Sequence, residues 1–208
     1  GYTAFVDNDR AYVESSAFQR DRDYWLAQYP TAPERLLTPL NTVRPNLQGI
    51  HASECLALPM SRSLYQQLES LAQQCGVTVF HVMLGALYVY FARTSQQYTF
   101  AVGLPVLNRS NAQFKQTMGL FVGVSPVLLR SGVNNSFVEL VQAINTTLKG
   151  VYRHQRFPVS EINRLVTTQP DAGALFDVNF SFQKLDYDVR FAGIPAQNTL
   201  LWSRWEQS

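Results

Sequence analysis

SFVELVQAINTTLKGVY, residues 136–152, is the stretch of this sequence that decides the fold. Ser136 and Glu139 have the spacing of a capping box, in which each side chain accepts a hydrogen bond from the backbone of the other residue at a helix start. Apolar residues then recur at helical spacing along one face, at Phe137, Leu140, Val141, Ile144, Leu148, Val151 and Tyr152. The pattern predicts a long amphipathic helix with one buried face.

Two apolar, β-prone segments precede this helix and predict buried strands at residues 98–106 and 121–130. Pro126 is expected to interrupt the hydrogen-bond ladder of the second strand, because proline has no backbone N–H. Farther upstream, Ser61 is the predicted N-cap of a helix that Gly76 ends.

Three further helical regions are expected. Residues 78–93 are apolar nearly all round and predict a helix inside the core. Residues 9–29 alternate charged and aromatic positions, as in one or two short helices. Pro158 suits the first turn of another short helix.

The order of these elements gives the fold class and the domain organisation. Helices interleaved with strands predict an α/β lobe (an α+β two-layer sandwich), in which helices cover a mixed sheet. Residues 1–30 are expected to be a helical lead-in, 31–49 a proline-rich linker and 50–208 the lobe, with both ends of the sequence appearing cut. Weaker strands are expected at 51–58 and 175–182, the latter pairing with 188–191.

Composition excludes several classes of function. The chain has 17 basic and 15 acidic residues without a basic run, which argues against nucleic acid as a partner. Cys55 and Cys75 fit neither a disulfide framework nor a metal-ligand spacing, so reduced thiols and a cytoplasmic setting are expected. The longest apolar stretch, residues 77–92, is too short to cross a membrane.

The three histidines, His51, His81 and His154, lie outside metal-ligand spacing of other candidate ligands, so no metal site is expected. His154 follows the long helix and is interpreted as a helix-end residue bonded to nearby carbonyls. His81 is interpreted as a core residue. With no nucleophile motif or phosphate-binding glycine loop, the residues alone indicate an α/β lobe with an aromatic surface.

Six segments, taken in order, resemble the condensation domains of nonribosomal peptide synthetases. They are DRAY at 9–12 with RD at 20–21 and YW at 24–25, GVT at 76–78 before the apolar helix, GLPVLNR at 103–109, MGLFVGVSP at 118–126, HQRFP at 154–158, and LFDVNFSF at 175–182. Any one segment would be weak, whereas six in the right order over nearly the whole chain are specific.

The resemblance implies two lobes of chloramphenicol-acetyltransferase-like topology around a tunnel. Peptidyl or aminoacyl carrier proteins deliver substrates on phosphopantetheine, and an acceptor amine attacks a donor thioester to form an amide. The second histidine of an H-H-x-x-x-D-G motif in the first lobe handles the amine proton and stabilises the intermediate. That motif is absent here, so we expect a C-terminal lobe without a catalytic residue or bound cofactor, inactive until the N-terminal lobe is supplied.

The resemblance also assigns candidate site residues. Those expected to line the tunnel wall are Asn108, Arg109, Gly123, Ser125 and Ser181, and those of the structural H-Q-x-Y-P-like motif are His154, Gln155 and Pro158. Gly123 replaces an asparagine of the family pattern, and the small polar Ser125 beside it could compensate.

Two alternatives stay open from the sequence. One is a lobe of another acyltransferase of this fold, such as an epimerisation, cyclisation or free-coenzyme-A enzyme. The other is a non-catalytic module that binds a carrier protein. A lobe separated from its counterpart is expected to expose an apolar, aromatic-rich face.

Overall fold

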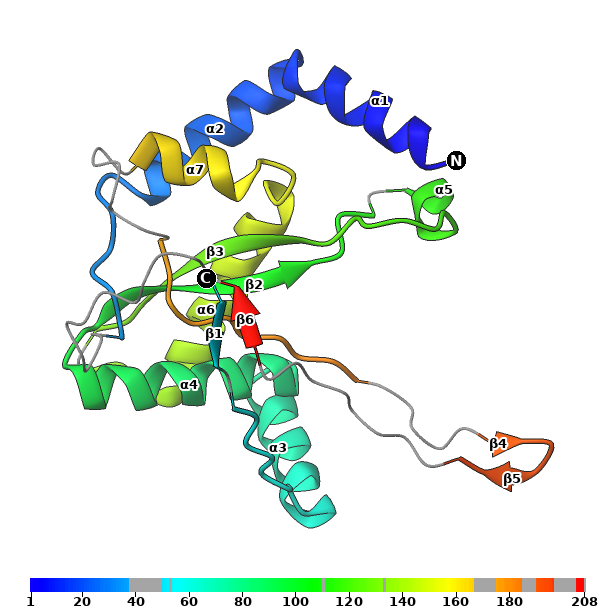
Figure 1. Cartoon of the computed structure of the whole chain (residues 1–208). Helices are drawn as coiled ribbons and strands as arrows, with labels where there is room; N and C mark the ends of the chain where they lie inside the picture. Colours follow the sequence, from blue (N-terminus) through cyan, green and yellow to red (C-terminus); the bar gives the residue numbers. More distant parts are fainter. Residues whose placement is uncertain are drawn as a thin grey trace. The chain divides into compact units, whose positions relative to one another are not determined.

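This computed structural model describes residues 1–37, 50–52, 54–109, 111–132, 134–166, 175–184, 190–196 and 205–207 (Figure 1). The chain divides into a larger unit, Gly1–Leu37 with Leu68–Ser181, and a smaller unit, Thr38–Gln67 with Phe182–Ser208. Helix α3 (Arg62–Gln74) begins in the smaller unit and continues into the larger one.

The centre of the larger unit is the antiparallel pair β2 (Thr99–Val106) and β3 (Gly123–Arg130), in register from Thr99 opposite Arg130 to Val106 opposite Gly123. Their long connection contains α5 (Ala112–Lys115). On the other edge of β2, residues 178–180 run parallel to it, and Gly103 exchanges two 2.9 Å backbone hydrogen bonds with them. The sheet of the larger unit is thus a small antiparallel pair with a single parallel bridge at one edge.

Helices cover the strand pair on both sides, which confirms the α/β class. In Figure 1 the strands lie between α2 (Ser16–Gln28) and α7 (Val159–Val166) on one side and α4 (Val79–Ser95) on the other. Helix α6 (Phe137–Arg153) packs against α4 and β3. Residues 1–30 contain α1 (Tyr2–Val13) followed by α2, and α1 begins earlier than the charged and aromatic pattern indicates.

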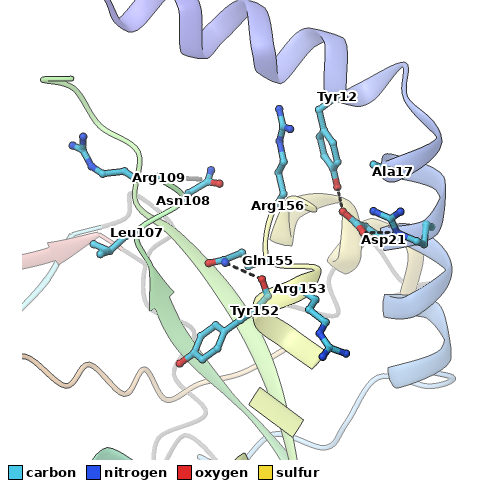
Figure 2. A pocket seen from close by; sticks show the side chains of 11 residues that line it. Tyr12, Ala17, Asp21, Leu107, Asn108, Arg109, Tyr152, Arg153, Gln155 and Arg156 are labelled. Carbon is cyan, nitrogen blue, oxygen red and sulfur yellow. Dashed lines mark hydrogen bonds and ion pairs between the residues drawn. The ribbon is translucent and has the colours of Figure 1, made fainter. Parts of the chain in front are cut away.

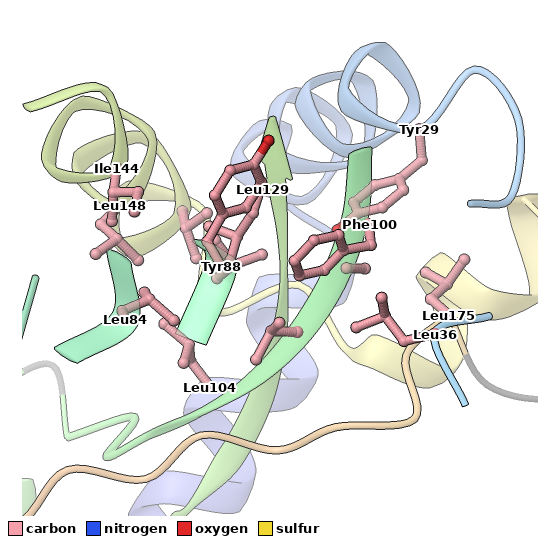
Figure 3. Packing of buried hydrophobic residues seen from close by; sticks show 14 of the residues in the cluster. Tyr29, Leu36, Leu84, Tyr88, Phe100, Leu104, Leu129, Ile144, Leu148 and Leu175 are labelled. Carbon is pink, nitrogen blue, oxygen red and sulfur yellow. The ribbon is translucent and has the colours of Figure 1, made fainter. Parts of the chain in front are cut away.

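The core fills the space between these layers (Figure 3). Leu84 and Tyr88 of α4 meet Phe100 of β2, whose ring stacks on that of Tyr88 at 5.2 Å. Leu129 of β3 and Leu148 of α6 close the cluster. Most of the helical face predicted from the sequence is buried, namely Leu140, Val141, Ile144, Leu148 and Val151, whereas Tyr152 at its end is 42% exposed.

Both long helices begin with a capping box. In α6, Ser136 N donates to Glu139 Oε2 (2.8 Å) and Glu139 N donates to Ser136 Oγ, which confirms the prediction. In α4, Thr78 N donates to Nδ1 of His81 (3.3 Å), which is only half-buried. The interpretation of His81 as a core residue is therefore wrong: its ring caps the helix start. Ser61 caps α3 as expected, accepting from Leu64 N at 3.1 Å.

Pro126 does not interrupt β3, contrary to the expectation. It lies opposite Gly103 in the ladder. The N–H and C=O of Gly103 point away from Pro126 and bond residues 178 and 180 instead, so this is a non-hydrogen-bonded pair of the antiparallel ladder. The missing N–H of the proline therefore costs no hydrogen bond at this position.

The prediction of a strand at residues 175–182 is wrong, because pairing is confined to a single bridge at Asn179. Phe176, Val178 and Phe180 do pack against the core, so the alternation in this segment is real. It reports which face of the chain is buried and does not report whether the backbone is hydrogen-bonded along its length.

In the smaller unit, β1 (Ile50–Ala52) pairs with β6 (Trp205–Gln207), so the strand expected at 51–58 is much shorter. β4 (Arg190–Phe191) pairs with β5 (Ile194–Pro195), not with residues 175–182 as predicted. Ala192 and Gly193 turn this hairpin, with φ of 49° and 82°. Of the expected linker, residues 31–37 contain no helix or strand, and 38–49 lie outside the described residues.

Two strand glycines differ in what surrounds them, which gives a matched test. A Cβ on Gly103 would overlap Asn179 Oδ1 and the ring of Phe176, whereas one on Gly123 would touch only Val106 Cγ2 at 3.7 Å. We expect Gly103→Ala to lower the free energy of unfolding by about 2 kcal/mol because the crossing segment must move. Gly123→Ala should change it by less than about 0.5 kcal/mol. Urea denaturation measures both, and equal effects would contradict the close crossing at Gly103.

Candidate functional site

The HQRFP segment directly follows α6 and binds this helix end to α2. His154 is the C-cap residue of α6, and its carbonyl accepts a 3.0 Å hydrogen bond from the indole N–H of Trp25. Tyr24 stacks its ring on the imidazole, with ring centroids 4.0 Å apart. Phe157 is buried against Phe18. The motif thus acts in the packing of two helices that are far apart in sequence.

A buried carboxylate lies at the centre of this contact. Asp21, only 3% exposed, accepts a 2.6 Å hydrogen bond from the hydroxyl of Tyr12 through Oδ2. Its other oxygen, Oδ1, lies 2.8 Å from Nδ1 of His154. The expectation that His154 bonds nearby carbonyls is therefore wrong, because its ring partner is a carboxylate contributed by α2.

The environment keeps Tyr12 protonated. Burial, together with the hydrogen bond to Asp21, raises the pKa of the Tyr12 phenol far above its ordinary value. Tyr12 therefore remains a hydrogen-bond donor at all physiological pH values. Because both oxygens of Asp21 are engaged and the group is buried, the Tyr12–Asp21–His154 cluster can fix geometry but offers no accessible base.

Arg156 extends the cluster to α1. Its guanidinium lies 4.1 Å above the Tyr12 ring and donates to the carbonyl and side-chain oxygens of Asn8, at 2.6 and 2.7 Å. Asp9 is 3.8 Å away, at the edge of ion-pair range. The backbone and side chain of Asn8 therefore hold this guanidinium more closely than any carboxylate does.

Asn108 and Arg109 occupy the turn after β2, where Asn108 has a positive φ of 49°. Arg109 donates to the carbonyls of Phe114, Thr117 and Gly119, and its guanidinium lies 4.0 Å from the centre of the Phe121 ring. One side chain therefore organises the whole connection between β2 and β3.

These groups surround a cavity of about 380 Å³ (Figure 2). Its walls come from three regions: the α1–α2 pair, the turn after β2, and the end of α6 with the following loop. The lining residues are Tyr12, Ala17, Arg20, Asp21, Leu107, Asn108, Arg109, Tyr152, Arg153, Gln155 and Arg156.

The structure gathers only part of the set predicted from the sequence around this cavity. Asn108, Arg109 and Gln155 line it. Gly123 begins β3 and the 2% exposed Ser125 lies within that strand, both outside the lining. Ser181 is exposed. Pro158 precedes α7, and its carbonyl accepts from the N–H groups of Glu161 and Ile162.

Asp21 and Tyr12 are the site residues whose role the sequence did not reveal. A signal for Asp21 was present, since it lies one helical turn before the buried Trp25 and hence on the inward face of α2. A carboxylate on such a face requires polar partners. Their identity depends on which distant segments pack there, which helical periodicity does not specify.

The described residues contain neither a cluster of metal ligands nor a single helix that could span a membrane. In the described part of the chain, His, Cys, Asp and Glu side chains nowhere gather in threes as metal ligands would. Among the described helices, none alone has the length and apolarity to cross a membrane; α3 and α4 meet these criteria only as a pair, bent by 97°.

Comparisons with known proteins agree on one family. The model of the Condensation domain family matches residues 1–203. Tyrocidine synthase 3 of Brevibacillus parabrevis is 27% identical over 190 residues, covering 90% of this chain and 3% of the synthase. Surfactin synthase subunit 1 of Bacillus subtilis (strain 168) is 28% identical over 188 residues, covering 88% and 5%. The chain thus spans a small fraction of these curated relatives.

Solved structures show the same fold. The first condensation domain of the CDA synthetase superimposes with a TM-score of 0.76 at 22% identity, covering 93% of this chain and 41% of that one. The starter condensation domain of rhizomide synthetase RzmA, solved with C8-CoA, gives a TM-score of 0.73 at 22% identity, covering 92% and 42%. This chain therefore matches about two fifths of each solved chain.

The buried carboxylate gives a stability prediction. We expect Asp21→Asn to lower the free energy of unfolding by about 3 kcal/mol, because it removes the charge that both Tyr12 and His154 face. Asp23→Asn is the matched control, since that exposed carboxylate of α2 bonds only Gln19 in the described structure and should cost less than about 0.5 kcal/mol. Chemical denaturation of both variants checks this, and similar losses would contradict a central role for Asp21.

The raised pKa of Tyr12 predicts how stability responds to alkali. Since its pKa is higher in the folded chain, the phenol ionises first in the unfolded chain. Its contribution is complete below pH about 10 and is lost as the pH rises toward the folded pKa. Above pH about 10, Tyr12→Phe should therefore reduce the alkaline slope by up to about 1.4 kcal/mol per pH unit. Unfolding titrations from pH 9 to 11 that gave the same slope for the unmodified chain and for Tyr12→Phe would refute the assignment.

Proposed function

This chain belongs to the condensation-domain family, and we propose that it is the second lobe of a domain that joins carrier-tethered substrates through an amide bond. In this function both substrates arrive on the phosphopantetheine arms of carrier proteins. An acceptor amine attacks the donor thioester, the amide C–N bond forms as the C–S bond breaks, and the donor arm leaves as its thiol. The observation that carries the proposal is the family match, which extends over residues 1–203 and includes every segment of family resemblance in the sequence.

The assignment to a second lobe rests on two observations: the share of the solved condensation domains that this chain matches, and the absence of the H-H-x-x-x-D-G motif from its sequence. The solved condensation domains align with this chain over about two fifths of their own length. The H-H-x-x-x-D-G motif, which would supply the proton-handling histidine, is not present in these 208 residues. We therefore assign that histidine to the other lobe and expect the chain alone to be inactive, because both proton transfer and substrate positioning require the complete chamber.

This chain's own part in the reaction is to position groups. The Tyr12–Asp21–His154 cluster holds α2 against the end of α6, and Arg109 shapes the connection after β2, so the cavity between them has fixed walls. Gly123 and Ser125 would act from β3, where the absence of a Gly123 side chain leaves space beside Val106. A larger acceptor could use this space. Tunnel-lining roles for Asn108, Arg109 and Ser181 are part of the same proposal.

A row of exposed apolar side chains supports the proposal that another lobe packs against this chain. Met118, Leu120 and Val122 are 91%, 77% and 53% exposed, whereas Phe121 between them is buried. Tyr2 holds this row in place, because its hydroxyl donates to Leu120 O at 2.7 Å. Contiguous exposed apolar side chains usually mark an interface. We assign this row, together with the exposed Leu107, to contact with the first lobe.

Reconstitution tests the proposal. Mixing this chain with the N-terminal half of its domain should restore amide formation from loaded carrier proteins, while each half alone remains inactive. Leu120→Lys should weaken association of the halves at least about tenfold, because a charge would be buried in an apolar contact. Val138→Lys also replaces an exposed aliphatic residue with lysine, but on the first turn of α6 and outside the row, so it should leave association unchanged.

The possible outcomes separate the alternatives. Turnover by this chain alone would refute the lobe assignment. Binding of a phosphopantetheinylated carrier without turnover, even after the other half is added, would favour the non-catalytic carrier-binding module. Restored turnover that releases an epimer, a cyclised product or a free-coenzyme-A product would place the chain in another acyltransferase class of this fold.

A further inference from the structure

A second cavity, of about 270 Å³, lies at the end of the strand pair opposite to the cavity of Figure 2. Its lining includes Tyr98, directly before β2, and Ser131 and Gly132, directly after β3. The cavity of Figure 2 instead lies beside the turn that follows β2. The length of β2 separates these two regions by on the order of 25 Å. The second cavity is therefore a separate site.

Two helices give the second cavity an apolar wall. Val89 and Ala92 contribute from the last turns of α4, and Phe137 and Leu140 from the first turns of α6. The exposed Tyr98 adds a second aromatic residue at the entry to β2. Aliphatic and aromatic side chains gathered in a concave surface favour a flat apolar group in a ligand.

This wall is formed before any ligand arrives. Tyr88, which also lines the cavity, stacks its ring on Phe100 in the core and donates its hydroxyl to the carbonyl of Tyr98 at 2.9 Å. The end of α4 is thereby fixed to the start of β2. A wall that is already ordered lowers the entropic cost of binding, and the engaged hydroxyl of Tyr88 is not needed as a ligand donor.

The charge of this cavity comes from one side chain. Among the described residues that line it, Arg93 alone carries a charge. Arg93 is exposed, and its guanidinium forms no hydrogen bond or ion pair with another described residue. The negative end of the α4 dipole attracts this cation only weakly, since it amounts to a half charge. Glu139, on the first turn of α6, is committed to Ser136 in the capping box. The positive charge of Arg93 therefore remains available to a ligand.

We propose that the second cavity binds a small aromatic carboxylate, with its ring against the apolar wall and its carboxylate on Arg93. A carboxylate accepts paired hydrogen bonds from a guanidinium, and its single charge matches the single cation of the lining. Sites for drug-sized ligands have volumes of about 300 to 1,000 Å³, so this cavity suits a ligand of one or two fused rings. For so few atoms we expect a dissociation constant of about 0.1 to 1 mM.

Titration of the purified chain with indole-3-acetate, followed by calorimetry, tests the site independently of carrier proteins and amide formation. We expect saturable binding that Arg93→Gln weakens about tenfold, the loss of one charge-assisted contact. Val89→Glu should weaken it at least as much, because it places a like charge beside the carboxylate. Both changes are at exposed positions, so thermal unfolding should stay unchanged. Arg153→Gln, the same change at the cavity of Figure 2, is the matched control and should leave the affinity unaltered.

Two further ligands separate the contributions of charge and ring. Indole-3-acetamide, which keeps the ring but has no charge, should bind about tenfold more weakly than the acetate, and Arg93→Gln should weaken it no further. Hexanoate, which keeps the charge but has no ring, should bind at least about threefold more weakly. Lack of saturable binding, equal affinity for the acetate and either of these ligands, or equal weakening by Arg153→Gln would overturn the proposal.

Discussion

The arrangement of the larger unit depends on one buried carboxylate. Asp21 lies on α2, its Oδ2 accepts from Tyr12 of α1, and its Oδ1 faces the imidazole at the end of α6. Burying a carboxylate is costly unless its oxygens are hydrogen-bonded, so the folded state is stable only when all three helices meet at this point. The interaction specifies a geometry, whereas the surrounding rings of Phe18, Tyr24 and Phe157 supply most of the apolar burial.

A second constraint acts at the sheet. Gly103 lies between Pro126 on one strand and the crossing segment 176–180 on the other, and no side chain fits in that gap. Because Gly103 gives both backbone groups to the crossing segment, Pro126 loses no partner by lacking an N–H. Glycine and proline, each unfavourable in an isolated strand, are compatible here because they face one another.

Local patterns in the sequence predicted local structure well and long-range pairing poorly. The capping box of Ser136 and Glu139, the buried face of α6 and the cap at Ser61 were all correct, because each depends on residues within a few positions. The predicted strand at 175–182 and the predicted pairing of residues 188–191 with it were wrong, because hydrogen bonding between strands depends on segments that are far apart in the sequence. The hydrogen-bond partner predicted for the His154 ring was wrong for the same reason, since its actual partner, Asp21, lies 133 positions away in the sequence.

The candidate site shows the same division between residue type and placement. Family resemblance selected Asn108, Arg109 and Gln155, and all three line the cavity, but it did not reveal that Arg20, Arg153 and Arg156 line it too. Arg20, Arg153 and Arg156 are unremarkable in sequence, since each belongs to an ordinary mixed-charge stretch. Only the packing of α2 against the end of α6 brings them together, and that packing depends on Asp21.

Arg109 connects the cavity with the exposed apolar row. Arg109 is one of the residues that line the cavity, and its guanidinium donates to the carbonyls of Thr117 and Gly119 on either side of Met118. The same side chain that shapes one wall of the cavity therefore also fixes the segment that presents Met118 and Leu120.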